Sequence, residues 1–474
     1  MQFGTGVLLR GLPDYFIDKA NRQGIFNGRI VVVKSTSSGS TSSFETQDGL
    51  YTLNVRGIEN GVTIEENSIC SAISRVLSAS SEWATILACA RKKEFQIIIS
   101  NTTEVGLQLV LENIHQLPPT SFPAKLLAFL FERFRTFKGS QESGMVILPT
   151  ELIPDNGKKL HALVLELAYF NKLDKNFIQW LTGCNYFCSS LVDRIVPGKP
   201  DANFITDFEK RFGYRDELLT TAEVYCLWAI EGDEKVKSIL NFSEADKGII
   251  IAPDITIHRE LKLRLLNGTH TLTCGLAFLS GIETVKEAMD DPALSRYATH
   301  LMLNEIAPAI PYPVDKKTAH NFALSVFDRF RNPYIKHLWL GITLQYSMKL
   351  KMRVLPVLLH YYKNFNSVPP AIALGFAAWI LFMKVVKKEG ANYFGERKGV
   401  FYPIKDDHAE YFYTHWRQQG DSKIVNAVLK DESLWGANLA KLPGFEQDVN
   451  KKLKSLMAQG VLQTALEAEN KYGI

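Results

Sequence analysis

The chain opens with MQFGTGVLLRGLPDYFIDKANRQ (residues 1–23), and this stretch decides how the first half of the sequence is interpreted. Gly4 and Gly6 end a strand-like start and lead into a helical pattern, and a β-branched run, RIVVVK (29–34), follows about one helix later. That order is typical of a dinucleotide-binding βαβ unit, in which glycines let the backbone approach a pyrophosphate at the amino end of a helix. Leu9 replaces the third glycine of the usual G-x-G-x-x-G pattern, so a chance turn is the alternative.

The candidate dinucleotide contacts lie in this turn and at the ends of neighbouring strands. NAD-binding folds usually place a carboxylate after the second strand to bind the ribose 2′-hydroxyl, but Lys34, Ser35 and Thr36 stand there, and the first carboxylate is Glu45. These three residues could contact the adenosine ribose or belong to a surface loop, which leaves NAD and NADP open. The candidate cofactor-binding residues are Phe3, Gly4, Thr5, Gly6, Val7, Leu8, Leu9, Arg10, Lys34, Ser100 and Asn101.

Short apolar runs predict the fold class. RIVVVK, FQIIIS (95–100), MVILPT (145–150) and GIIIAP (248–253) alternate with helical patterns and lack polar alternation, which predicts strands buried on both faces of a parallel sheet. After about residue 254 the strand signal stops and helical periodicity dominates. The sequence therefore predicts an α/β, Rossmann-like doubly wound domain over residues 1–250 and a mostly helical, all-α domain over residues 251–474.

The composition is that of a soluble globular protein. The 474 residues are 46% hydrophobic and 22% charged, and a net charge of +4 gives no electrostatic reason to expect nucleic acid or a membrane as partner. The longest apolar run, AIALGFAAWILFM (371–383), is too short to cross a bilayer and is typical of a buried helix. Six cysteines without metal-ligand spacing predict a reduced, cytoplasmic protein with no disulfide framework and no metal site.

The segment LKLRLLNGTH (261–270) places Lys262, Asn267 and His270 in an otherwise amphipathic helical pattern, although Asn-Gly is unfavourable inside a helix. On a straight helix Asn267 lies about 140° and His270 about 80° around from Lys262, so all three share one side unless Asn-Gly breaks the helix. A lysine can transfer a proton, an amide can hold a carbonyl oxygen and an imidazole can orient a hydroxyl. The set suggests carbonyl reduction without a metal; a solvated lysine and a capping asparagine are the simpler interpretation.

Several segments resemble the mannitol dehydrogenase family of polyol-specific long-chain dehydrogenases. KLRLLNGTH (262–270) matches the family's Lys-x4-Asn-x2-His motif, and GTGVLLRG (4–11) is similar to its N-terminal nucleotide motif. SLVDRIVP (190–197), RFRNPYIKH (329–337) and SMKLKMRVLP (347–356) are similar to further family segments. The resemblance covers essentially the whole chain.

This resemblance implies NAD as the cofactor and a role for each residue of the motif. Lys262 would be the catalytic acid/base, Asn267 the amide that polarises the carbonyl, and His270 the residue that holds a substrate hydroxyl. Asp193, in the Val-Asp-Arg-Ile-x-Pro segment, would link the lysine to solvent protons.

Two further segments, NEIAPAIP (304–311) and VFYPIKDDHAEYF (400–412), look most like members of the family that reduce keto-uronic acids. A uronate needs a cation for its carboxylate, and Lys349, Lys351 and Arg353 are candidates. Relatives that act on other uronates or on mannitol, and a nucleotide-binding scaffold, are the alternatives. Loss of a motif residue would favour the scaffold, but all three are present.

One departure concerns a second hydrogen-bond donor to the carbonyl oxygen. Members of the family carry an Asp-Asn pair whose asparagine supplies it, whereas LPTELIPDNG (148–157) has Glu151 and Leu152 there. Asn156 or Asn101 would be the substitute. The candidate substrate-binding residues are Asn156, Lys349 and Arg353.

Overall fold

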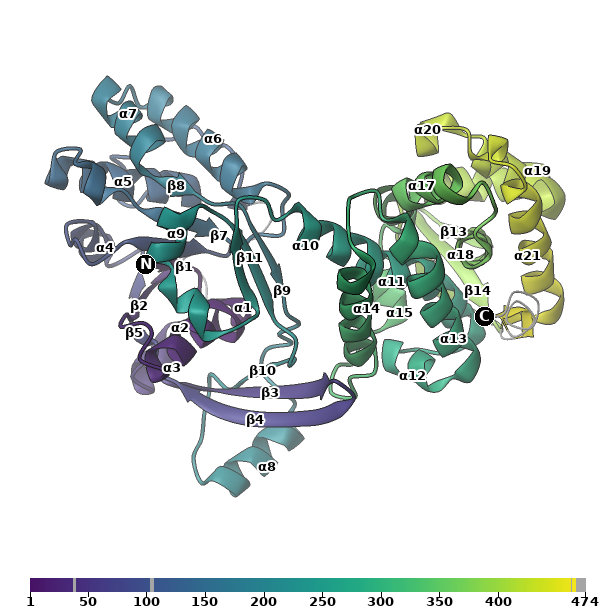
Figure 1. Ribbon diagram of the computed structural model, residues 1–474, viewed down its shortest axis with the longest axis horizontal. Coiled ribbons are helices and arrows are strands. Elements are labelled where there is room, and N and C mark those ends of the chain that lie inside the picture. The colour runs from purple at the N-terminus through teal and green to yellow at the C-terminus, as the bar shows by residue number, and fades with distance from the viewer. Residues whose placement is uncertain (37–39, 103–105, 462, 466–474) are drawn as a thin grey trace. The chain divides into compact units, whose positions relative to one another are not determined.

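The computed structural model describes residues 1–36, 40–102, 106–461 and 463–465, with only the backbone described at 420–422. The chain forms two compact units (Figure 1). The first unit comprises residues 1–57 and 63–255, and the second comprises residues 58–62 and the chain from 256 onward.

A six-stranded sheet, in which every neighbouring pair is parallel, organises the first unit. Its order is β5-β2-β1-β6-β7-β8. The strands are β1 (Gln2–Phe3), β2 (Ile30–Lys34), β5 (Ile73–Ser78), β6 (Ile97–Ser100), β7 (Val146–Pro149) and β8 (Tyr186–Phe187). The chain runs outward from β1 to β5 and then returns to the other side of β1 at β6. Open α/β sheets bind ligands at the carboxyl ends of the strands where the order reverses in this way.

Both faces of this sheet are covered. Val31 and Val33 of β2 pack into one apolar core, and Ile30 and Val32 pack into the core on the opposite face. The first face is covered by α4 (Trp83–Ala90), α5 (Phe122–Phe137), α6 (Asn156–Phe170) and α7 (Lys175–Cys184), and the second by α1 (Val7–Gly11) and α2 (Pro13–Arg22). The predicted doubly wound α/β fold is confirmed.

Part of the strand prediction is wrong. GIIIAP forms β12 (Ile249–Ala252), but this strand pairs with β11 (Leu227–Glu231) in a separate sheet that also contains β9 (Ser190–Asp193). An apolar run predicts a buried strand but carries no information about which sheet the strand joins. A further sheet contains β3 (Tyr51–Glu59), β4 (Val62–Cys70) and β10 (Thr220–Ala222).

The second unit is mostly helical, as predicted. Its apolar helix α18 (Pro370–Phe382) packs against α11 (Asn267–Ser280) and α21 (Phe445–Gln459). Its main helices are α10 (Thr256–Leu261), α11 (Asn267–Ser280), α12 (Val285–Asp290), α13 (Pro292–His300), α14 (Lys316–Phe330), α15 (Trp339–Ile342), α16 (Tyr346–Lys349), α17 (Leu355–Phe365), α18, α19 (Ala409–Leu429), α20 (Glu432–Trp435) and α21 (Phe445–Gln459). No helix within the described ranges has both the length and the apolar composition that crossing a membrane requires.

The second unit also contains strands, so the expected end of strand structure at residue 254 is wrong. The strands β13 (Lys387–Glu389), β14 (Asn392–Arg397) and β15 (Val400–Ile404) form an antiparallel sheet. Most of their side chains are at least partly exposed. They therefore lack the continuous apolar run that marks a strand of a buried sheet.

Asp14 is a fully buried carboxyl directly behind the glycine turn. Gln2 Nε2 donates to Asp14 Oδ2 at 3.4 Å and also lies 3.5 Å from the carbonyl oxygen of Gly4. Burial raises the pKa of Asp14 to about 7, against smaller lowering effects of Gln2 and of the Arg10 charge. Within the described part of the chain, Asp14 Oδ1 and Gln2 Oε1 have no hydrogen-bond partner. The fold therefore accommodates Asp14 best in its neutral form.

We expect Asp14→Asn to flatten the pH dependence of stability. The folded carboxyl keeps its proton up to about pH 7, whereas the ordinary value is 3.8. The free energy of unfolding should therefore fall as pH rises between those values, by about 1.4 kcal/mol per pKa unit. Denaturant titrations at about pH 5 and about pH 8 measure the fall. Asp207→Asn, at an exposed position of α8 (Ala202–Phe212), is the control. An unchanged fall in Asp14→Asn would contradict the assignment.

Candidate active site

The turn after β1 depends on Gly4. Its φ of 129° lies in the left-handed region that favours glycine. A Cβ there would lie 2.9 Å from the carbonyl oxygen of Asn101 and 3.0 Å from Leu9 Cδ1. Residues 4–8, all predicted cofactor contacts, are partly or fully exposed. The turn thus offers accessible backbone at the strand-order reversal, which fits a pyrophosphate.

The close-packing glycine that the pattern lacks at Leu9 is supplied by Gly11. Leu9 is fully buried in the core. A Cβ on Gly11 would lie 2.7 Å from Val196 Cγ2 and 2.9 Å from Val196 Cγ1, so only glycine lets α1 approach the segment after β9. The third glycine of the motif is therefore not lost: its packing role is taken by Gly11, two residues later in the chain.

We expect Gly11→Ala to destabilise the protein by about 1–3 kcal/mol, since the added methyl overpacks a filled contact. The melting temperature should fall, and Val196→Ala in the same chain should restore most of the loss. Gly183→Ala is the control, because a Cβ at Gly183 meets no atom within 4 Å. Equal stability of Gly11→Ala and wild type would show that the contact is not tight in solution.

Three of the predicted cofactor contacts, Phe3, Leu9 and Arg10, have buried side chains that support the turn from the protein interior. Phe3 and Leu9 have no exposed surface. The buried Arg10 side chain donates from Nη1 to the carbonyl oxygen of Thr5 at 3.0 Å and from Nε to Thr220 Oγ1 at 3.2 Å. These side chains fix the shape of the turn and leave only their backbone atoms for a ligand.

At the end of β2, the Lys34 side chain is buried and donates from Nζ to the carbonyl oxygen of Thr36 at 2.9 Å. Ser35 Oγ is buried and has no hydrogen-bond partner within the described ranges, which fits a contact to a ribose hydroxyl. Part of the predicted Ser/Thr/Gly loop is helical, as α3 (Ser42–Thr46), and residues 37–39 lie outside the described residues.

Glu151, which follows β7, is hydrogen-bonded to the residues at the end of β6. Its buried carboxylate accepts hydrogen bonds from Ser100 Oγ at 3.3 Å, from the backbone N–H of Thr102 at 2.8 Å and from Thr102 Oγ1 at 3.0 Å. Asn101 donates from Nδ2 to the carbonyl oxygen and hydroxyl of Thr150. Ser100 and Asn101 therefore have structural partners at the position where cofactor contacts are predicted.

Asn156 is a structural residue. Its side chain is fully buried, and Nδ2 lies within 3.0 Å of the carbonyl oxygens of Pro149, Glu151 and Ser190. Its Oδ1 accepts from the backbone N–H of Ser190 at 2.8 Å. The predicted contact of Asn156 with substrate is therefore corrected, because the amide joins β7 to β9 and has no exposed surface.

In the second unit, Lys262 and Asn267 lie on one continuous helical segment. Residues Lys262–Leu266 form a π-helical turn, η4, between α10 and α11, and Asn267 has helical angles of φ −74° and ψ −33°. The wide turn adds a residue to the helical rotation, so the angles expected for a straight helix are wrong. Asn-Gly does not break the helix.

Two more π-helical turns meet η4 beside Gly268: η5 (Leu301–Ile306) and η7 (Leu350–Val354). A Cβ on Gly268 would lie 3.7 Å from Leu263 O of η4, 3.8 Å from Ile306 Cδ1 of η5 and 3.9 Å from Arg353 O of η7. π-Helical turns are rare and occur frequently at functional sites. Their convergence marks this end of α11 as the candidate catalytic region.

Two arginines tie η7 to the helix that carries the motif. Arg264 donates from Nη1 to the carbonyl oxygens of Met352 and Arg353 at 2.7 and 3.0 Å, and Glu260 pairs with its Nε at 2.8 Å. Arg353 reaches back and donates from Nη1 to Thr271 Oγ1 at 3.1 Å. These contacts hold η7 against α11.

His270 lies among aromatic and cationic side chains. Its ring stacks on Phe330 with centroids 4.3 Å apart and meets the His337 ring edge-on at 5.0 Å. Burial lowers the pKa of His270 well below its usual range, with further lowering by His337, Arg329, Arg353 and Lys349. His270 Nε2 is buried without a hydrogen-bond partner among the described residues. A neutral imidazole with an unused nitrogen fits the predicted role of holding a substrate hydroxyl.

The three predicted carboxylate ligands differ in position. Lys349 is half-buried, donates from Nζ to the carbonyl oxygen of Ile342 at 2.9 Å, and has a pKa lowered by burial and by Arg353. Burial also lowers the pKa of Arg353. Lys351 is exposed. Lys349 and Arg353 therefore remain candidates, whereas Lys351 is not supported.

Asp193 belongs to the first unit and Lys262 to the second. Asp193 ends β9 opposite Leu227 of β11 and is buried, at 6% exposed. Lys262 is the first residue of η4. The predicted proton link between Asp193 and Lys262 stays a prediction.

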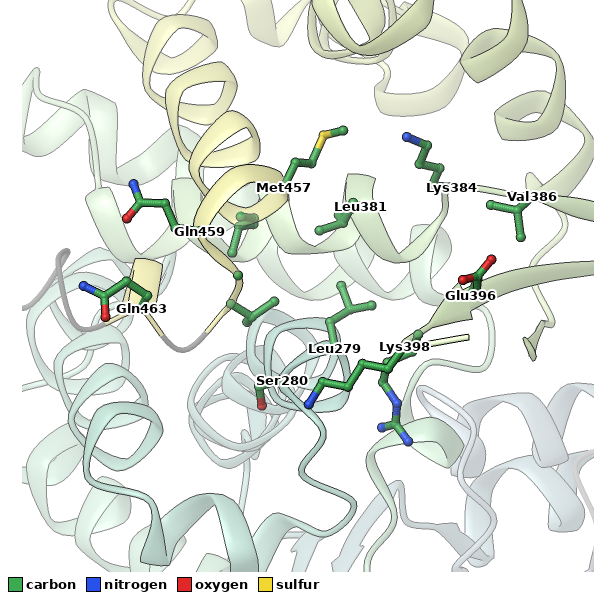
Figure 2. A pocket seen from close by; sticks show the side chains of 14 residues that line it. Leu279, Ser280, Leu381, Lys384, Val386, Glu396, Lys398, Met457, Gln459 and Gln463 are labelled. Carbon is green, nitrogen blue, oxygen red and sulfur yellow. The ribbon is translucent and has the colours of Figure 1, made fainter. Parts of the chain in front are cut away.

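Two cavities of the second unit lie away from the motif. One of about 780 Å³, bounded by Leu279, Leu381, Lys398 and Met457, lies at the opposite end of α11 (Figure 2). Another, of about 760 Å³, is lined by residues that include Asn304, His320 and His360. Neither is lined by Lys262, Asn267 or His270. No group of three or more His, Cys, Asp or Glu side chains within the described ranges could hold a metal ion.

Comparison with known families decides the relationship of this chain. The mannitol dehydrogenase Rossmann domain matches residues 1–243, and the mannitol dehydrogenase C-terminal domain matches residues 254–457. The chain belongs to the mannitol dehydrogenase family. It is therefore an oxidoreductase that acts on CH–OH groups.

Relatives within the mannitol dehydrogenase family include altronate oxidoreductases. The one from Klebsiella pneumoniae is 38% identical over 97% of this chain and 95% of its own length, and the one from Halalkalibacterium halodurans is 36% identical over 100% and 93%. Mannitol 2-dehydrogenase from Pseudomonas fluorescens, in ternary complex with NAD and D-mannitol, has a TM-score of 0.68 at 22% identity, covering 99% of this chain and 94% of its own. D-Sorbitol dehydrogenase has a TM-score of 0.76 at 20% identity, covering 98% and 94%. These two structures show the same fold.

The sequence did not single out three residues beside the family motif. Arg329 and His337 are the first and last residues of RFRNPYIKH, a segment that only the resemblance to the mannitol dehydrogenases marks, and both lower the pKa of His270. Thr271 directly follows His270 and is recognisable only through its contact with Arg353. The local sequence pattern does not distinguish a basic residue or a threonine that makes such a contact from one that does not.

Proposed function

We propose that this protein catalyses the reversible, NAD-dependent reduction of D-tagaturonate to D-altronate, the tagaturonate reductase or altronate oxidoreductase reaction. The names of the full-length relatives and the Lys262, Asn267 and His270 motif support this proposal. The observation that carries it is the cationic surrounding of His270, where Arg353 and Lys349 lie half-buried. A carboxylate on the substrate would complement these charges, whereas mannitol or fructose would leave them unpaired.

The proposed mechanism uses three side chains on one helix. A bound nicotinamide supplies the hydride for the carbonyl carbon. Lys262 would give its ammonium proton to the carbonyl oxygen as charge develops there, and Asn267 would donate a hydrogen bond to the same oxygen. His270, neutral because burial lowers its pKa, would hold a neighbouring hydroxyl. In the oxidation of altronate, Lys262 would act as the base, with Asp193 linking it to solvent protons as the family resemblance implies.

NAD is the proposed cofactor, with a modest preference over NADP. The backbone of the Gly4 turn fits a pyrophosphate, and the Ser35 hydroxyl, which has no hydrogen-bond partner within the described ranges, fits the ribose. Lys34 lacks an adjacent arginine and already donates to Thr36, which makes it a poor clamp for a 2′-phosphate. The loop also lacks a carboxylate that would repel that phosphate.

A substrate comparison tests the proposed function. Enzyme dialysed against EDTA should oxidise NADH with D-tagaturonate at a higher kcat/KM than with D-fructuronate or D-fructose, and NADH should be better than NADPH. Activity should survive the dialysis because the proposed chemistry needs no metal. Highest activity with fructuronate or fructose would instead assign the protein to a sibling reaction, and activity lost to EDTA and restored by zinc would contradict metal independence.

We expect Lys262→Ala to lower kcat by about 10²–10⁴-fold, because removal of one general acid/base costs that much. NADH binding, followed by fluorescence titration, should be kept. Lys351→Ala is the matched control, since Lys351 is exposed on η7 and is not part of the proposed machinery. A Lys262→Ala enzyme with more than about a tenth of wild-type kcat would rule out the assigned role.

A further inference from the structure

Thr271 connects Arg353 to the turn of the helix that carries Asn267. Its hydroxyl donates to the carbonyl oxygen of Asn267 at 2.7 Å and accepts from Arg353 Nη1 at 3.1 Å. A hydroxyl has one proton, so the donation to Asn267 leaves its lone pairs facing the guanidinium. Thr271 has no exposed surface, which excludes water as a competing partner.

The Arg353 guanidinium keeps most of its hydrogen-bonding capacity. Of its five N–H groups, one is used by Thr271, and the described residues provide no other acceptor. Lys349 likewise uses one donor, to Ile342. His270 Nε2 is buried and unpaired in the described part of the chain. These groups lie close enough for Arg353 and Lys349 to lower the pKa of His270.

The charges in this region favour an anionic ligand. The groups that shift the pKa of His270 are an imidazole and three cations, with no carboxylate among them. Asp406 acts on Lys349, but its Oδ2 already accepts from the backbone N–H of Ser347 at 2.7 Å. Half-buried cations with unused donors are stabilised most by a carboxylate that can accept two parallel hydrogen bonds.

We propose that Thr271 is a positioning residue for substrate specificity: it orients the Arg353 guanidinium so that its remaining N–H groups receive the carboxylate of a hexuronate substrate. This inference rests on the proposed function. Without the hydroxyl, the long Arg353 side chain has several rotamers of similar energy, and ordering it on binding weakens affinity for the carboxylate. The reacting carbonyl is held by other residues, so the effect falls on uronate binding rather than on turnover.

Steady-state kinetics of Thr271→Val and Thr271→Ser test this inference. Valine keeps the branched shape and removes the hydroxyl, so KM for D-tagaturonate should rise about ten-fold with kcat changed less than about three-fold, as for a lost hydrogen bond to a charged group. KM for NADH and the slower reaction with D-fructose should not change. Thr271→Ser should restore KM to near the wild-type value.

Thr273→Val is the matched control. Thr273 lies on the same helix and is equally buried, but its hydroxyl has no hydrogen-bond partner in the described ranges. It should keep the wild-type KM for tagaturonate. If Thr271→Val does not fold, Thr271→Ala provides the same comparison.

Three outcomes would overturn the inference. The first is an unchanged KM for tagaturonate in Thr271→Val. The second is an equal rise in KM for tagaturonate, fructose and NADH, which would show a general structural role, and the third is a Thr271→Ser enzyme as impaired as the valine variant. A wild-type enzyme that reduces fructose but no uronate would overturn the proposed function as well, so the wild-type substrate comparison separates the two failures.

Discussion

The π-helical turn at Lys262–Leu266 is the constraint on which the candidate catalytic region depends. A wide turn leaves the backbone poorly packed unless neighbouring elements fill the space around it. Here η5 and η7 contact η4, and a Cβ on Gly268 would meet all three turns at ordinary van der Waals distances. An added methyl group would therefore fit at Gly268, so packing does not explain the use of Asn-Gly, with its low helix propensity, at this position. The turn also sets the direction from which Asn267 and His270 leave the helix relative to Lys262.

Buried arginines maintain this arrangement at an electrostatic cost. The Arg264 charge is balanced by Glu260 next to it, and its guanidinium satisfies two backbone carbonyls of η7. Among the described residues Arg353 has no such balancing carboxylate, and its acceptor is the neutral hydroxyl of Thr271. Arg264 thus has structural partners on both sides, whereas Arg353 is held in one orientation by Thr271 and keeps N–H groups for a ligand. The pair shows how a clamp between two helices can also present a cation to a ligand.

Sequence patterns predicted the elements but not their distant contacts. The glycines at 4 and 6, the apolar strands and the Lys/Asn/His spacing are local signals, and the structure places the turn and the helix where they indicate. The role of Gly11 depends on Val196, which is far along the chain. The sequence KLRLL has ordinary helical periodicity, so it gives no sign of a π turn. Asn156 and Asn101 looked like substitutes for a catalytic amide, yet both side chains donate hydrogen bonds to backbone carbonyls at the end of β7.

The buried charged groups of the two units differ in sign and in pairing, and the difference fits the proposed ligand of each unit. In the first unit the buried carboxyls are neutral or bonded: Asp14 has a raised pKa, and Glu151 accepts three hydrogen bonds. A negative charge left unpaired there would repel the phosphates of a dinucleotide. In the second unit Arg353, one of the cations that lower the pKa of His270, has no carboxylate partner among the described residues. Desolvated cations without counterions cost stability, and a bound carboxylate offsets that cost. On the proposed assignment, part of the stability of the second unit is therefore supplied by its substrate.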